Sequence, residues 1–94
     1  MEPIKGYKGF DRNMKCKDFQ YEEGKEYTCK KAVACETGFH FCEYPLDVFS
    51  YYPPAESIYS TVVGDGQISN HHGDTKIACT KIKIGAKLNF AAMI

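Results

Sequence analysis

The alternation of apolar and polar residues predicts short strands separated by turns in the first third of the chain. Residues 6–11 form the first expected strand, and its two glycines indicate close backbone contact or a bend. Apolar and polar residues alternate over 19–21 and again over 26–30, on either side of a turn at 22–25. These two segments are therefore expected to pair as a hairpin.

The middle of the chain predicts three further strands. Residues 32–35 are apolar, and residues 39–42 place two phenylalanine rings on one face of a strand. Residues 58–63 are rich in β-branched side chains and apolar on both faces, which is typical of a central strand. The sequence Gly-Asp-Gly at 64–66 is expected to turn the chain after this strand.

The clearest strand pattern lies near the end of the chain, at 77–84. Its two outward lysines indicate one solvated face, or an edge protected from further pairing. A polar loop is expected before it, at 68–74, and Gly85 is expected to end it. One more short strand at 88–90 and a docked apolar tail at 91–94 complete the prediction.

One helix is expected, over about 45–52. Proline is well tolerated at the first helical position, and the prolines at 53 and 54 cannot continue the hydrogen bonding. Three side chains recur at helical spacing and form an apolar stripe: Leu46, Phe49 and Tyr52. The stripe is expected to cover the rings of Phe39 and Phe41. The pattern thus predicts an α+β fold, a small mostly antiparallel sheet of about six to seven short strands with one short helix.

Length and charge limit the possible functions. The 94 residues fit a single domain over 1–94 with one modest core. The 12 basic and 12 acidic side chains cancel, so direct binding of nucleic acid is not expected. Residues 32–75 carry only acids and residues 76–94 only lysines. Acidic and basic strands are expected to lie side by side, the alternative being a bipolar surface that meets a partner. No apolar run is long enough to cross a membrane, and no secretory signal is visible.

The five cysteines are expected to be free thiols. Their number is odd, and free thiols suit a reducing cytoplasm. None of their spacings is a zinc knuckle. His40 and Cys42 lie two residues apart on one strand face, which makes them weak candidates for a metal site that His71 or His72 of the loop would join. We expect no metal and no cofactor.

The candidate binding residues are of two kinds. Histidines titrate near neutral pH, and a polar loop is where function concentrates; tyrosines can stack on a nucleotide base or anchor an interface. The candidates are His40, Tyr51, Tyr52, Tyr59, His71, His72 and Asp74. The alternative for each is an ordinary structural or surface role. No nucleophile, base and orienting group at suitable spacing is apparent, so no catalytic residue is assigned.

An ordered set of motifs carries a family resemblance over roughly residues 6–88. The motifs are Lys8-Gly9-Phe10, Cys16 before Gln20-Tyr21, Gly24-Lys25-Glu26-Tyr27, Cys35, Gly38-Phe39-His40-Phe41-Cys42, Pro45-Leu46-Asp47-Val48 and Tyr51-Tyr52-Pro53. With these motifs the chain resembles a small domain family of unknown function found mainly in bacteriophages and prophages. The resemblance implies a viral origin and action in the host bacterial cytoplasm, and it supplies no catalytic residues.

Three functions are expected from these features. The first is a phage accessory protein that binds a host protein or a host defence signal stoichiometrically, as an anti-CRISPR or a nucleotide-sequestering inhibitor does. The second is a degenerate or minimal ADP-ribosyltransferase-like domain that binds a nucleotide. It rests on a resemblance of the strand at 38–42, the helix ending in tyrosine and the strand at 58–63, with Glu56 or Asp65 in place of the usual late acid. The third is a structural phage component that forms a homo-oligomer through its apolar tail at 90–94 and the lysine-bearing strand at 76–84.

Overall fold

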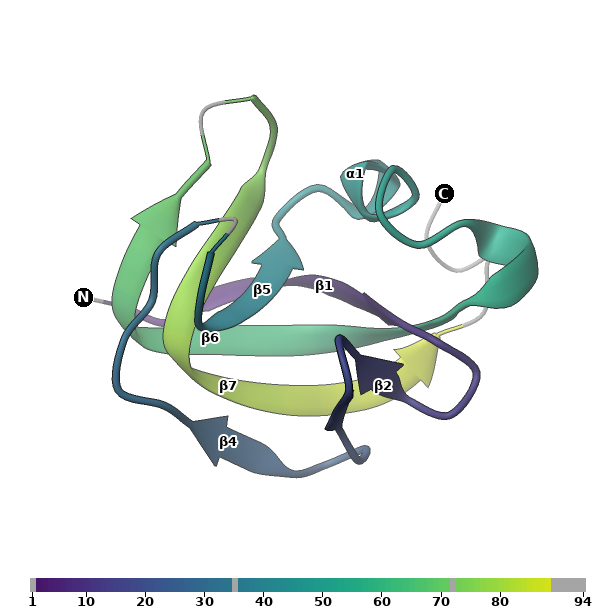
Figure 1. Cartoon of the computed structure of the whole chain (residues 1–94), viewed down its shortest axis with the longest axis horizontal. Coiled ribbons are helices and arrows are strands. Elements are labelled where there is room, and N and C mark those ends of the chain that lie inside the picture. Colours follow the sequence, from purple (N-terminus) through teal and green to yellow (C-terminus); the bar gives the residue numbers. More distant parts are fainter. Residues whose placement is uncertain (1, 35, 72, 89–94) are drawn as a thin grey trace.

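The computed structural model describes residues 2–34, 36–71 and 73–88. Four antiparallel strands form a closed circuit in it (Figure 1). They are β1 (Ile4–Phe10), β5 (Phe39–Cys42), β6 (Ile58–Asn70) and β7 (Lys76–Leu88). β1 pairs with β6 and, through Tyr7 and Cys42, with β5; β7 pairs with both β5 and β6. A fifth strand, β4 (Glu26–Thr28), lies on β7. The expected strands at 6–11, 39–42 and 77–84 are therefore confirmed.

The two longest strands form one curved hairpin, in which β6 and β7 run side by side (Figure 1). The expected turn at 64–66 is wrong, because β6 continues through it. The register shifts between Asp65 and Ile68, and Gly66 has φ +77, which is the geometry of a bulge that bends a strand. Gly85 likewise does not end β7. β7 lies between strands, so its lysines do not mark an edge.

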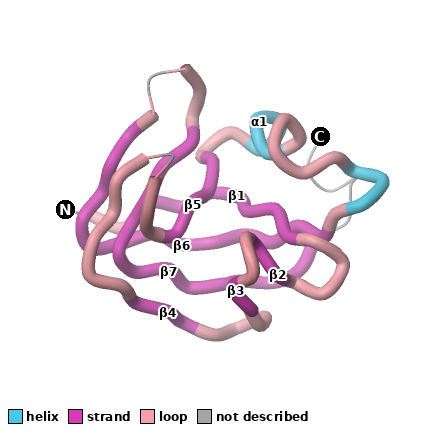
Figure 2. Tube along the Cα trace, in the orientation of Figure 1, coloured by secondary structure: helices cyan, strands magenta, loops and turns pink. Residues whose placement is uncertain are grey.

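The hairpin expected over 19–30 is also wrong. β3 (Phe19–Gln20) pairs with β2 (Lys15–Cys16), while β4 pairs with β7 (Figure 2). The two residues between β2 and β3 are Lys17 and Asp18, with φ of +50 and +68. Two-residue hairpin turns with positive φ usually contain Asn or Gly. The sequence Lys17-Asp18 therefore does not indicate the hairpin that β2 and β3 form.

Of two other expected elements, the strand at 32–35 is not formed by the described residues 32–34 and the helix is shorter than the pattern indicated. Residues 32–34 form no strand; Val33 makes one isolated bridge to Thr37 across a turn. The helix α1 covers only Pro45–Val48 and is followed by turns, and a 3₁₀ turn covers Pro54–Glu56. In the part of the chain that the structure describes, the fold is thus a mostly antiparallel sheet structure of seven strands with one short helix. The expected strand at 88–90 begins at the last residue of β7, and the rest of it lies outside the described residues, as does the tail at 91–94.

The main core is formed by the inward faces of the circuit. Its buried members are Phe10, Met14, Tyr21, Phe39, Phe41, Val62, Ile77, Cys79, Ile82 and Ile84. Phe41 lies so close to Gly6 and Gly64 that a Cβ at either glycine would collide with its ring. The glycines of β1 and β6 therefore provide the space that this ring fills.

A second, smaller cluster holds the helix, and it corrects the expected packing. Val48 is 2% exposed and packs with Cys42 and Tyr59, whereas Leu46 is 39% exposed. The helix thus covers the Cys42 side of β5 and not the rings of Phe39 and Phe41, which belong to the main core. The stripe of Leu46, Phe49 and Tyr52 needs nearly two helical turns, whereas the helix ends after Val48, so the spacing did not predict the packing.

Opposite charges lie on neighbouring strands, in part as predicted: Asp65 belongs to the acidic stretch, whereas Glu26 belongs to the first third of the chain. Lys81 Nζ lies 3.5 Å from Glu26 Oε1 on β4, and Asp65 of β6 is opposite Lys81 in the register. Both side chains of the ion pair are about half exposed, so the pair adds little stability. Within the described ranges, no helix has the length and apolarity that a membrane span requires.

Candidate functional site

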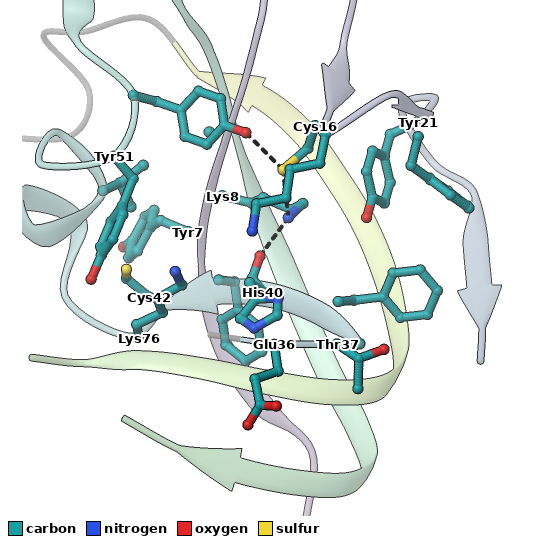
Figure 3. A pocket seen from close by; sticks show the side chains of 18 residues that line it. Tyr7, Lys8, Cys16, Tyr21, Glu36, Thr37, His40, Cys42, Tyr51 and Lys76 are labelled. Carbon is teal, nitrogen blue, oxygen red and sulfur yellow. Dashed lines mark hydrogen bonds between the residues drawn. The ribbon is translucent and has the colours of Figure 1, made fainter. Parts of the chain in front are cut away.

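A cleft of about 480 Å³ opens between three parts of the fold (Figure 3). β1 and β5 form its floor, the β2–β3 hairpin one wall, and the segment from Val48 to Tyr52 the other. Its volume is in the range of ordinary small-molecule sites. Aromatic rings line it from all three parts: Tyr7, Phe19, Tyr21, Phe39, Tyr51 and Tyr52.

A buried lysine lies at the floor of the cleft. Lys8 is 3% exposed, and its Nζ donates a hydrogen bond to the His40 carbonyl oxygen at 2.5 Å (Figure 3). The same Nζ lies 3.7 Å from Cys16 Sγ and 5.1 Å from the centre of the Tyr21 ring. No carboxylate among the described residues forms an ion pair with it. Burial lowers the pKa of Lys8, and the neighbouring Cys16 opposes this only in part.

Tyr52 completes this group from the opposite wall. Its hydroxyl donates a hydrogen bond to Cys16 Sγ at 2.7 Å, and burial together with this bond raises its pKa. The Tyr52 carbonyl in turn accepts a hydrogen bond from the Tyr59 hydroxyl. The hydrogen bond from Tyr59 of β6 thus fixes the backbone of Tyr52, and the Tyr52 hydroxyl points at the Cys16 thiol.

His40 lies in the cleft, on β5, as a half-buried side chain. Burial lowers its pKa to about 4, and the positive charges of Lys76, Lys8 and Lys17 act in the same direction. The imidazole is thus neutral at neutral pH, and it can accept or donate a hydrogen bond to a ligand without adding charge. The adjacent Cys42 is buried, which raises the pKa of its thiol to about 12 and leaves it protonated.

Three of the sequence candidates contact one another beside the cleft, and of these three only Tyr51 lines it. The Tyr51 hydroxyl donates to Asp74 Oδ2 at 2.5 Å, and His71 Nδ1 lies 2.9 Å from Asp74 Oδ1. Burial opposes ionisation of Asp74, but the hydrogen bonds from Tyr51 and His71 outweigh it and lower the pKa to about 2. Lys76 Nζ lies 4.2 Å from the centre of the Tyr51 ring. Asp74 and Lys76 thus hold this ring at the edge of the cleft.

Tyr59, one of the two remaining candidates, does not line the cleft. Tyr59 is 2% exposed and lies under Phe49, so it cannot stack on a ligand. His72 lies outside the described residues. No group of three or more histidine, cysteine or acidic side chains is placed to hold a metal ion within residues 2–34, 36–71 and 73–88.

Lys8, Cys16 and Lys76 are the site residues that sequence reasoning missed. A lysine usually lies at the surface, and a free cysteine usually packs as a small apolar side chain. Neither residue type by itself therefore indicates a binding site. One signal was available: Lys8 is two residues before Phe10, so both lie on the same, inward face of β1.

A model of a known family matches residues 4–94 of the chain. The chain belongs to this family, which is described as Domain of unknown function (DUF7666). No curated protein and no solved structure matches the chain. The family match spans every residue that lines the cleft.

Proposed function

We propose that the cleft binds a small anionic ligand with a planar ring, of the nucleotide type. We further propose that the chain is a phage-encoded accessory protein of the host bacterial cytoplasm that sequesters such a ligand as a host defence signal. The phage origin is supported by the motif resemblance, and the ligand class by the composition of the cleft.

The observation that carries the ligand class is the combination of rings and unbalanced positive charge. Lys17 and Lys76 line the described part of the cleft as cations against a single acid, Glu36, while the buried Lys8, whose pKa is lowered, is not counted as a charge. Tyr51 and Phe19 are large rings exposed at the opposite walls, where a ligand ring can stack. Stacking of a base on an aromatic side chain contributes about 1–3 kcal/mol, and lysine at the rim pairs with phosphate.

The proposal is tested by titrating the full chain with a panel of nucleotides in a calorimeter. The panel comprises nucleoside monophosphates, nucleoside triphosphates and cyclic dinucleotides, with the uncharged nucleosides as a comparison. We expect at least one phosphorylated member to bind and its nucleoside to bind much more weakly. Binding of nucleosides and nucleotides with equal affinity, or of none, would contradict the proposal.

Two variants distinguish binding of the ligand in the cleft from its unspecific attraction to surface lysines. Lys76→Met removes the cation that lies over the Tyr51 ring and is expected to weaken binding about tenfold, the loss of one charge-assisted contact. Lys83→Met removes an exposed lysine of the same strand that does not line the cleft. Equal losses in the two variants would indicate unspecific attraction.

A protein partner is the second candidate, and one surface favours it. Tyr44, Leu46 and Tyr51 are large apolar side chains exposed within one short segment around α1. Such a cluster is typical of an interface anchor. Glu56 and Asp65, which an ADP-ribosyltransferase-like activity would need, do not line the cleft, so binding is favoured over catalysis. The enzymatic and the homo-oligomeric alternatives remain predictions.

A further inference from the structure

We propose that Lys8 and Cys16 form a reversible covalent cross-link between the lysine Nζ and the cysteine Sγ when a peroxide oxidises the thiol. Such a link would be a modification site in the floor of the cleft, independent of any ligand. It would join β1 to β2 and so fix the β2–β3 wall against the floor.

The geometry places the two reacting atoms together before any oxidation. Nζ and Sγ are 3.7 Å apart, a few tenths of an ångström beyond the distance of about 3–3.5 Å from which bonds form. Lys8 is directed at this point because its other contacts fix it: the His40 carbonyl accepts its hydrogen bond, and the Tyr21 ring lies beside it. Cys16 is only partly buried and lines the cleft, so a molecule as small as hydrogen peroxide can reach its sulfur.

The chemistry is balanced in two steps. The thiol and hydrogen peroxide first give the sulfenic acid and one water, with the sulfur oxidised and the peroxide bond broken. The Lys8 nitrogen then attacks the sulfenyl sulfur; the N–S bond forms, the S–O bond breaks, and hydroxide leaves. The hydroxide takes up a proton and the nitrogen loses one, so that the second step releases another water. Two thiols of an external reductant reverse the link, returning amine and thiol and forming one disulfide.

The surroundings of the pair suit this second step. Burial lowers the pKa of Lys8 and so favours the neutral amine, which is the form that attacks. Tyr52 places its hydroxyl 2.7 Å from Sγ, where it can donate a proton to the leaving oxygen. Because the pKa of Tyr52 is raised, the hydroxyl keeps that proton at neutral pH.

Peptide mass spectrometry of the full chain after brief treatment with hydrogen peroxide tests the link. Remaining thiols are blocked with an alkylating reagent before digestion with trypsin. We expect the peptides of Lys8 and Cys16 to be joined, with a loss of about 2 Da and no cleavage after Lys8. The joined species should disappear after a dithiol reductant is added and should not form in denaturant.

Cys29 is the matched control within the same chain. It is exposed, and Lys30 and Lys31 follow it directly in sequence, so unselective coupling of oxidised thiols to lysines would appear there too. Oxidised Cys29 without a lysine link, beside linked Lys8 and Cys16, supports the proposal. A Cys16 sulfenic acid that persists and can be trapped by a dione, with Lys8 unmodified, would overturn it. A linked pair that retains an oxygen would overturn the condensation step.

Discussion

Acidification should destabilise the fold through His40. Burial lowers the pKa of His40 from its ordinary value of 6.5 to about 4, so the unfolded chain binds this proton at a pH at which the folded chain does not. Stability is therefore complete above about pH 6.5 and declines as the pH falls toward 4. The difference between the two values, at about 1.4 kcal/mol for each pH unit, sets an upper limit of about 3 kcal/mol. Because His40 is only half buried, solvent screening reduces the expected loss of stability to about 1–2 kcal/mol. A small domain has a total stability of about 5–15 kcal/mol, so the loss is easily measured.

Urea unfolding followed by circular dichroism at a series of pH values provides the measurement. The His40→Gln variant is the control, because glutamine keeps polar hydrogen-bonding atoms and does not titrate. The slope of stability against pH between about 4 and 6.5 should be much smaller in the variant than in the wild type. Asp74, with its pKa lowered to about 2, loses its stabilising charge only below about pH 4 and does not contribute here. Equal slopes in the two proteins would refute the burial argument for His40.

Three further predictions follow from the packing and the polar contacts. Val48→Ala should lower the free energy of unfolding by about 2 kcal/mol in thermal melts, because it removes two buried methyl groups and leaves a cavity. Leu46→Ala, at an exposed site of the same helix, should lower it by less than about 0.5 kcal/mol. Tyr51→Phe should raise the pKa of Asp74 from about 2 toward 3.8 in an NMR titration, and an unchanged value would exclude the hydroxyl as its cause. Gly64→Ala should cost about 1–3 kcal/mol in urea unfolding, because the added Cβ meets an aromatic ring of β5.

The strands that sequence could predict are those whose signal is local. The alternation over 77–84 and the paired rings at 39 and 41 depend only on which residues lie inside, and both are confirmed. Strand pairing is not local. The segment of β3 was correctly predicted to be extended, but it pairs with β2 through Lys17 and Asp18, which both have positive φ although neither is glycine or asparagine. Likewise, Gly-Asp-Gly at 64–66 is a common turn sequence, yet it forms a bulge here. The reason is that β7 continues to pair with β6 on both sides of these residues.

The candidate site was predictable by residue type and not by position. Tyr51, His71 and Asp74 are candidates because their side chains can bind ligands, and only the fold shows that they contact one another. The sequence does not indicate that Lys8 is buried, because a lysine is usually exposed and its burial here depends on the Cys16 thiol and on the His40 carbonyl of β5. A buried polar group is therefore visible only once its partners are placed.

An NMR titration tests most directly the claim that the cleft is a binding site for a ring-bearing anion. Amide chemical shifts of the full chain are followed as the tightest member of the nucleotide panel is added. The largest changes are expected at residues that line the cleft, such as Gly9, His40 and Lys76, with little change at Gln67, which does not line it. Changes centred on Gln67, or none at the cleft, would contradict the account.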